Sequence, residues 1–286
     1  MDHLMNLVTL NELLSTTNKE YAVPAVNCFN LEMIQAVLEA AEELCSPVII
    51  QSGPKDVQYS SPETLSAMAQ AVAKNKRGPF AIHLDHGHDY GMAVRCIRAG
   101  YTSVMFDGSA LDLQGNIALT SKIVELAHSA GLSCEAELGT IGDRDEEGHK
   151  IENDYMTDPD AAEKFVQKTG VDCLAVGIGN AHGFYPLPPN LDLERLKKIQ
   201  TLTAIPLVLH GGSGLPDEQI KAAIHLGIAK INFSTAARSR MIVQVKEYVD
   251  RNSDSPKADL MCAAGRTGFK EAVYEMIRLC GSENKA

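Results

Sequence analysis

The stretch AIHLDHGHDY (81–90) begins as an apolar strand and ends with three histidines and two aspartates within seven residues. Each of these groups is costly to remove from water unless it is paired or bound. These groups cluster where a buried strand should end, and this clustering predicts a binding partner that offsets the cost of desolvation. A bound cation is the first candidate.

Similar short runs of β-forming residues recur along the chain, and amphipathic stretches with apolar residues at helical spacing lie between them. Asn30 is a predicted helix N-cap, and Asp158 and Gly170 are predicted to start and stop another helix. Largely apolar strands that alternate with helices are typical of a parallel sheet covered on both faces. Eight strands are expected, at 21–27, 46–52, 80–86, 103–109, 132–138, 173–179, 205–211 and 228–234. For 286 residues, a single-domain (β/α)₈ TIM barrel spanning residues 1–286 fits this α/β pattern better than an open sheet.

Composition narrows the class of protein. Hydrophobic residues make up 45% of the chain and the formal net charge is −11, which indicates a globular protein and argues against nucleic acid as a partner. No apolar run approaches the roughly 20 residues that cross a bilayer, so no membrane partner is expected. The N-terminal stretch MDHLMNLVTLNELL lacks the basic region of a signal peptide. The seven cysteines are scattered without CxxC spacing, and reduced thiols in a cytoplasmic protein are expected.

Polar residues gather at the expected strand ends, where barrels of this class form their active sites. His86, His182 and His210 belong to three different strands and would converge on one rim. Three neutral imidazoles around an open fourth position are typical of a catalytic zinc site. His83 shares a strand face with Asp85 and is expected to pack inside the barrel. Among the strand beginnings, Lys230 is the polar exception.

Two glycine-rich turns follow the last two strands, HGGSG (210–214) and NFSTAAR (232–238). Each leads into a predicted helix, and backbone N–H groups at a helix start bind anions. Barrels commonly bind phosphate in this region, so the turns predict a phosphate site, with ordinary tight turns as the alternative. The long charged segment 139–159 is expected to be a binding loop or a lid.

With these motifs, the chain resembles the class II, zinc-dependent ketose-bisphosphate aldolases, nearest the tagatose-bisphosphate branch with the fructose-bisphosphate enzymes close behind. The likeness spans nearly the whole chain and includes HLDHG, TSVMFDGS, CEAELG, LVLHGGSGLP and KINFSTAAR. No one of these runs is specific, but together they are.

The resemblance implies reversible aldol cleavage of tagatose- or fructose-1,6-bisphosphate to dihydroxyacetone phosphate and glyceraldehyde 3-phosphate, through a metal-stabilised enediolate. His86, His182 and His210 would hold one Zn²⁺ per subunit, and Glu137 would be an alternative ligand. Asp85 would handle the proton on the aldehyde oxygen. Zinc that takes up the enediolate charge would stabilise the transition state by several kcal/mol, which corresponds to a rate increase of thousands-fold.

The resemblance also implies further site residues and partners. A second acid from the long loop, Asp145 or its neighbour Glu146, would move the proton at the enediolate carbon. A monovalent cation, Na⁺ or K⁺, often accompanies the glycine turns in this family. Homodimers or homotetramers are expected, and some tagatose-type members use an accessory aldolase subunit. The substrate-binding residues would be Asn27, Gly183, Gly211, Gly212, Ser213, Asn232, Ser234 and Thr235.

Departures from the family pattern leave alternatives open. The loop reads GDRDE (142–146) where the family usually has Gly-Gly-x-Glu-Asp. Gly53 aligns with a Ser or Thr of the family. Near the C-terminus, the family often has an arginine that contacts the acceptor phosphate, and this chain offers only Lys257 there. A different phosphorylated ketose or acceptor aldehyde is therefore an alternative, as is a non-catalytic zinc-binding barrel subunit. A metallohydrolase would share the histidines but would not need two phosphate turns. A Schiff-base aldolase would need a desolvated lysine inside the barrel.

Overall fold

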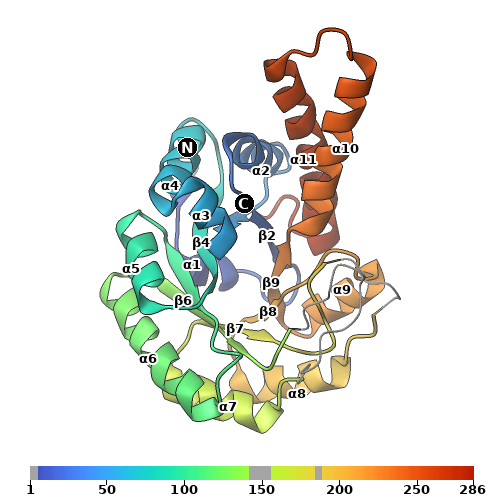
Figure 1. Cartoon of the computed structure of the whole chain (residues 1–286). Coiled ribbons are helices and arrows are strands. Elements are labelled where there is room, and N and C mark those ends of the chain that lie inside the picture. The colour runs from blue at the N-terminus through green and yellow to red at the C-terminus, as the bar shows by residue number, and fades with distance from the viewer. Residues whose placement is uncertain (1–5, 142–155, 184–188) are drawn as a thin grey trace.

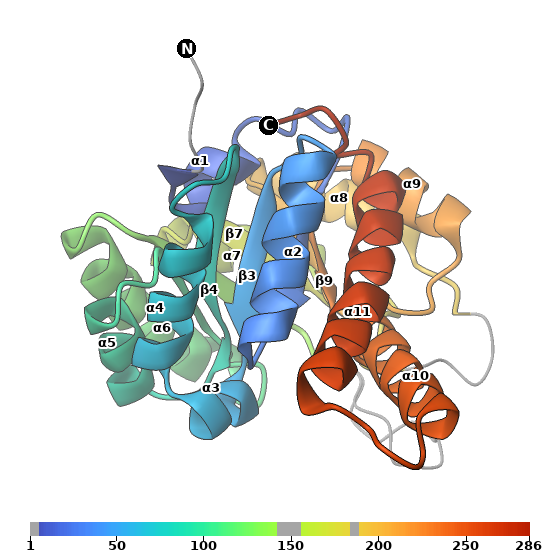
Figure 2. The ribbon, with the colours of Figure 1, turned by 90° about the horizontal axis from the view of Figure 1, so that it is seen from above.

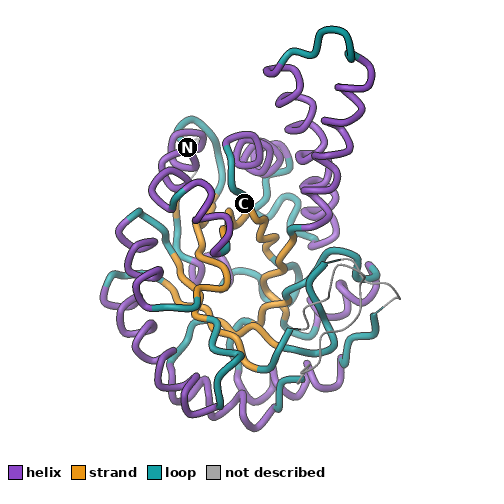
Figure 3. Tube along the Cα trace, viewed as in Figure 1, coloured by secondary structure: helices purple, strands orange, loops and turns teal. Residues whose placement is uncertain are grey.

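The computed structural model describes residues 6–141, 156–183 and 189–286. In these ranges eight parallel strands close into a barrel, in the order β4-β3-β2-β9-β8-β7-β6-β5 with β5 returning to β4. Figure 3 shows the ring of strands inside a ring of helices. The predicted TIM barrel is therefore confirmed. The barrel strands are β2 (Val23–Asn27), β3 (Val48–Ser52), β4 (Pro79–Gly87), β5 (Ser103–Phe106), β6 (Ser133–Leu138), β7 (Cys173–Val176), β8 (Leu207–Leu209) and β9 (Ile228–Phe233).

Several strands end earlier than the sequence predicted, so that part of the polar chemistry lies just beyond them. β5 ends at Phe106, β7 at Val176 and β8 at Leu209, and His210 is thus the first residue after its strand. A further strand that the sequence did not predict, β1 (Asn6–Leu7), pairs with the start of β4.

The described helices surround the barrel, and their ends follow local chemistry. The Asn30 side chain accepts a hydrogen bond from the Met33 N–H at the start of α2, and Asp158 does the same for Ala161 in α7, as predicted. Gly170 ends α7 with φ of 66°. The helices are α1 (Leu10–Leu14), α2 (Leu31–Glu43), α3 (Pro54–Ser60), α4 (Pro62–Ala73), α5 (Tyr90–Arg98), α6 (Leu113–Ser129), α7 (Pro159–Thr169), α8 (Leu193–Thr203), α9 (Asp217–His225), α10 (Thr235–Arg251) and α11 (Ala258–Cys280).

The last two helices, α10 and α11, pack side by side and extend beyond the ring of helices (Figures 1 and 2). Within the described ranges, no helix combines the length and the apolar character needed to span a membrane.

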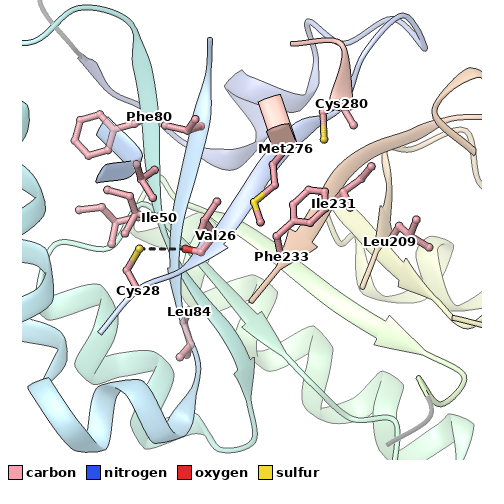
Figure 4. Packing of buried hydrophobic residues seen from close by; sticks show 14 of the residues in the cluster. Val26, Cys28, Ile50, Phe80, Leu84, Leu209, Ile231, Phe233, Met276 and Cys280 are labelled. Atoms are coloured by element: carbon pink, nitrogen blue, oxygen red, sulfur yellow. Dashed lines mark hydrogen bonds between the residues drawn. The ribbon is translucent and has the colours of Figure 1, made fainter. Parts of the chain in front are cut away.

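Two apolar layers hold the barrel, because side chains alternate between the two faces of each strand. Outward-facing residues such as Val26, Ile50 and Leu84 pack beneath the helices (Figure 4). Inward-facing residues include Ile49 and Ala81, and α1 closes the N-terminal end of the barrel with buried leucines. The interior above this plug is polar, and it leads to the C-terminal rim.

Candidate active site

The three predicted histidines meet at the C-terminal rim of the barrel. His86 lies at the end of β4, His182 follows β7 and His210 follows β8. Their candidate ligand nitrogens all lie within 4.8 Å of one another. The ring centroid of His86 lies 5.0 Å from that of His182 and 4.6 Å from that of His210. The convergence expected from three separate strands is therefore present.

A bulge in β4 brings two consecutive side chains into the site. The register of β4 against β5 shifts between Leu84 and Gly87, and His86 has a φ of 50°. Regular alternation sends Asp85 into the barrel and would send His86 outward, whereas a bulge re-aims a side chain. The next residue must be glycine, because a Cβ at Gly87 would lie 2.6 Å from the Met105 carbonyl oxygen.

The nitrogen atoms available at this cluster suit a metal ion. The Nδ1 atom of His86 lies 2.7 Å from Asp107 Oδ2, so its Nε2 is left for a ligand. Nδ1 of His210 is buried and has no hydrogen-bond partner among the described residues. Burial lowers the pKa of His210 to about 4, which keeps the ring in the neutral form that binds metals.

Glu137 lies beside the cluster, where an alternative ligand was expected. Its Oε2 is 3.4 Å from Nδ1 of His210 and 3.8 Å from Nδ1 of His86. Together with His86 and Asp107 it forms a second group with metal-binding geometry. Burial, followed by the Asp107 charge, holds the pKa of Glu137 well above its usual range in the metal-free protein.

Asp85 is fixed as a carboxylate by amide donors from three other strands. Its Oδ2 accepts hydrogen bonds from Asn27 at 2.9 Å and Gln51 at 3.2 Å, and its Oδ1 accepts one from Asn232 at 3.0 Å. In the metal-free protein, burial alone raises the pKa of Asp85, but the charge of a protonated His86 and the Asn27 hydrogen bond help to outweigh it and hold that pKa below its usual range. An ionised carboxylate beside the histidines can accept a proton.

Two cavities share His86 and His182 in their linings, and we call them the first and second lobes; His210 lines neither. The first lobe, about 210 Å³, is lined by Asn27, Asp85, His86, His182, Gly183, Gly211, Ser213, Asn232, Ser234 and Thr235. The second lobe, about 430 Å³, shares Asn27, His86, His182 and Ser234 with the first, and adds residues such as Lys55, Asp107, Ser109, Glu137 and Arg238. The arrangement provides space for a substrate on each side of a metal ion.

Comparisons with known proteins agree with this geometry. The profile of the family described as fructose-bisphosphate aldolase class-II matches residues 8–285. The chain belongs to the class II fructose-bisphosphate aldolase family. It is therefore an aldolase, a carbon–carbon lyase, in a family that is generally metal-dependent.

Its relatives match along their whole length. A probable fructose-bisphosphate aldolase of Bacillus subtilis (strain 168) is 41% identical over 286 residues, which cover 99% of this chain and 100% of that protein. The crystal structure of the YdjI aldolase from Escherichia coli K12 is 38% identical, with a TM-score of 0.86 and coverage of 98% and 100%. A putative fructose-1,6-biphosphate aldolase from Coccidioides immitis is 29% identical, with a TM-score of 0.86 and 97% coverage of both chains.

Most of the predicted residues of this aldolase line the first lobe, and Gly212 is an exception. The Gly212 N–H donates to the Asn232 carbonyl at 3.0 Å, and a Cβ there would lie 2.6 Å from the Ile231 side chain. Gly212 therefore packs the turn against β9, and it is absent from the residues that line either lobe. Gly211, with φ of 68°, lets the same turn approach the Ala181 carbonyl, where a Cβ would lie at 2.0 Å.

The other predictions fall in different places. Asp145 and Glu146 lie outside the described residues. Lys257 precedes α11, in the turn after α10, and does not line either lobe. His83 is fully buried inside the barrel, as expected, and His88 is exposed.

Sequence reasoning assigned no role to several residues that shape the site. Gln51 is a polar residue in the middle of the buried run VIIQS, and this interruption is a signal that could have identified it. Asp107 follows β5 directly, but its contact with His86 depends on strand register. Lys230 is completely buried and pairs with Glu135 at 2.8 Å, so it is not available as a free amine.

Proposed function

We propose that this aldolase catalyses the zinc-dependent, reversible cleavage of a ketose 1,6-bisphosphate, either tagatose- or fructose-1,6-bisphosphate. The products are dihydroxyacetone phosphate and glyceraldehyde 3-phosphate. The observation that carries the proposal is the cluster of His86, His182 and His210, of which His86 and His182 line both cavity lobes. Zinc held by these imidazoles would stabilise the negative charge that develops on the substrate oxygens as the C3–C4 bond breaks.

The first lobe suits the dihydroxyacetone phosphate half of the substrate. Gly183, Gly211 and Ser213 line it together with Ser234 and Thr235, where the 17-residue helix α10 begins. Backbone N–H groups at a helix start and on glycine turns favour a phosphate. We assign the phosphate to these residues, and Na⁺ or K⁺ at the glycine turns stays a prediction.

Asn27, Gln51 and Asn232 hold Asp85 in the wall of the first lobe for proton transfer. In cleavage, the Asp85 carboxylate accepts the proton of the C4 hydroxyl as that oxygen becomes the aldehyde, and in synthesis it returns the proton. The second proton, at the carbon of dihydroxyacetone phosphate, is assigned to Asp145 or Glu146.

The second lobe suits the half of the substrate that carries the other phosphate. Lys55 and Arg238 are the lysine and arginine that line it among the described residues. Arg238 is held in place by Asp56 Oδ1 at 2.8 Å and by the Phe29 ring, whose centroid is 5.2 Å away. These two cations support recognition of a phosphate where the family's arginine is missing from the turn at Lys257.

A cleavage assay on zinc-loaded enzyme with a panel of ketose phosphates tests the proposal. We expect turnover of at least one of the two bisphosphates, loss of activity in a strong chelator, recovery with zinc, and no inactivation by borohydride in the presence of substrate. Full activity after stringent removal of metal would contradict the proposal. We also propose a homodimer or homotetramer, the state that the family implies, which analytical ultracentrifugation measures.

A further inference from the structure

The layer of the barrel interior next to the histidine cluster is charged, although it is sealed from solvent. Glu135 precedes Glu137 by two positions on β6 and faces the same way, one layer deeper. Glu135, Lys230 and His83 are all 0% exposed, and so is His210. Charges at such depth are costly unless they are paired, and Glu135 is paired on both of its oxygens.

The contacts form a chain that leads to one of the proposed metal ligands. Glu135 Oε2 lies 2.8 Å from the Lys230 ammonium, and Glu135 Oε1 lies 3.0 Å from Nε2 of His210. The His83 Nε2 atom is 3.4 Å from Oε2, and its Nδ1 lies 2.8 Å from the Ser103 hydroxyl. Lys230 is therefore joined through Glu135 to the far side of the His210 ring.

This chain fixes which nitrogen of His210 carries the hydrogen. A carboxylate has no hydrogen to donate, so Nε2 of His210 must be the donor in its contact with Glu135. In a neutral ring, Nδ1 then carries a lone pair and no hydrogen. That atom is buried without a hydrogen-bond partner among the residues described, it lies 3.4 Å from Glu137 Oε2, and its ring belongs to the His86, His182 and His210 cluster.

Lys230 is the cation that pairs with Glu135 in this layer. Its ammonium lies 2.8 Å from Glu135 Oε2, which leaves Oε1 to accept the Nε2–H of His210 at 3.0 Å.

We propose that Glu135, which pairs with Lys230 and accepts the Nε2–H of His210, is a positioning residue that presents Nδ1 of His210 to the catalytic metal. The proposal rests on the proposed zinc site. It gives a role to the buried Lys–Glu pair that the proton transfers at Asp85 do not use. Groups hydrogen-bonded to metal ligands typically alter metal affinity 10- to 100-fold.

Two double variants test the proposal, because both remove the buried charges and they differ only in the acceptor at position 135. Glu135→Leu/Lys230→Met leaves no oxygen for the Nε2–H of His210. Glu135→Gln/Lys230→Met keeps an amide oxygen there. Ile199→Ala, at a fully buried position of α8 in the outer layer, is the control for lost stability alone. The zinc dissociation constant is measured for each protein by competition with a chromophoric chelator.

We expect zinc to bind the Leu variant 10- to 100-fold more weakly than the wild type. The Gln variant and the Ile199→Ala control should stay within a few-fold of wild type. Equal zinc affinity in the two double variants would overturn the proposal. If the wild-type protein itself binds no zinc, the proposed function fails, and this outcome is distinct from a failure of the positioning role.

A measurement on the unmodified protein decides the matter if a double variant does not fold. Long-range ¹⁵N–¹H NMR correlations of the zinc-free protein report which nitrogen of each neutral histidine carries the hydrogen. We expect the Nε2–H form for His210. The Nδ1–H form would overturn the proposal whatever the variants do.

Discussion

At the scale of single residues, the site depends on side chains whose protonation and orientation are set by their neighbours. Asp107 contacts Nδ1 of His86, and Glu135 contacts Nε2 of His210. Nε2 of His86 and Nδ1 of His210 are therefore the nitrogens left to bind a metal. Amide donors hold Asp85 as a carboxylate without adding a competing charge.

Asp85→Asn tests the proton acceptor. The substitution keeps the size of the side chain but removes its ability to take a proton, so kcat for cleavage should fall by about 10²- to 10⁴-fold. Steady-state kinetics are measured together with zinc content. A variant that retains zinc and keeps kcat within about threefold of wild type would show that Asp85 is not the base.

Lys55→Ala tests recognition of the second phosphate. Lys55 is exposed at the start of α3 and lines the second lobe. Loss of a charged hydrogen bond of about 1.5–3 kcal/mol should raise KM for the bisphosphate at least tenfold. KM for the corresponding ketose 1-phosphate should not change. Lys74→Ala, at an exposed lysine outside both lobes, is the matched control, and equal behaviour of the two variants would contradict the assignment.

His83 predicts a dependence of stability on pH in the zinc-free protein. Burial lowers the pKa of His83 to about 3 in the folded state, against about 6.5 in the unfolded chain. The unfolded chain therefore binds more protons at low pH. The contribution of His83 to stability is complete above pH 6.5 and is lost as the pH falls toward 3, by up to about 1.4 kcal/mol per unit.

Urea unfolding of the wild type and His83→Gln at pH 7 and pH 5 measures this effect. The free energy of unfolding should fall less between these values in the variant, since it lacks the titrating ring. Equal losses in the two proteins would show that His83 does not carry the expected pKa shift.

At the scale of elements, the strands and helices followed from local patterns, whereas the irregularities did not. Runs such as VIIQS read as strands because they are apolar and β-rich, and Asn30 caps α2 through a hydrogen bond only three residues away. The bulge at Asp85 and His86 depends on pairing with β5, which a single run of sequence does not contain. The pairing of Lys230 with Glu135 likewise requires the register of two strands that are not neighbours in the barrel.

The short helix α1 gives an element-scale prediction of stability. Leu10 is fully buried where α1 closes the barrel, so Leu10→Ala should lower the free energy of unfolding by about 2–5 kcal/mol. Leu260→Ala is the control, because Leu260 in α11 is 48% exposed and should change stability by no more than about 0.5 kcal/mol. Chemical denaturation of both variants measures the difference, and similar losses would show that α1 is not part of the core.

At the scale of the whole molecule, closure of the barrel is what turns scattered residues into a site. His86 and His210 are 124 positions apart in the chain, yet their ring centroids are 4.6 Å apart. The sequence predicted this convergence because parallel barrel strands all end on one rim. The same closure places Asp85 in the wall of the first lobe, where the amide donors of three other strands can reach it.

The most direct test of the central claim is the position of the metal itself. Crystals of the zinc-loaded enzyme, measured on both sides of the zinc absorption edge, give an anomalous difference map that locates the ion. We predict one strong peak per subunit at the C-terminal rim, bound by Nε2 of His86, by His182 and by Nδ1 of His210. A peak elsewhere, or no peak in crystals of an enzyme that remains active, would contradict this account.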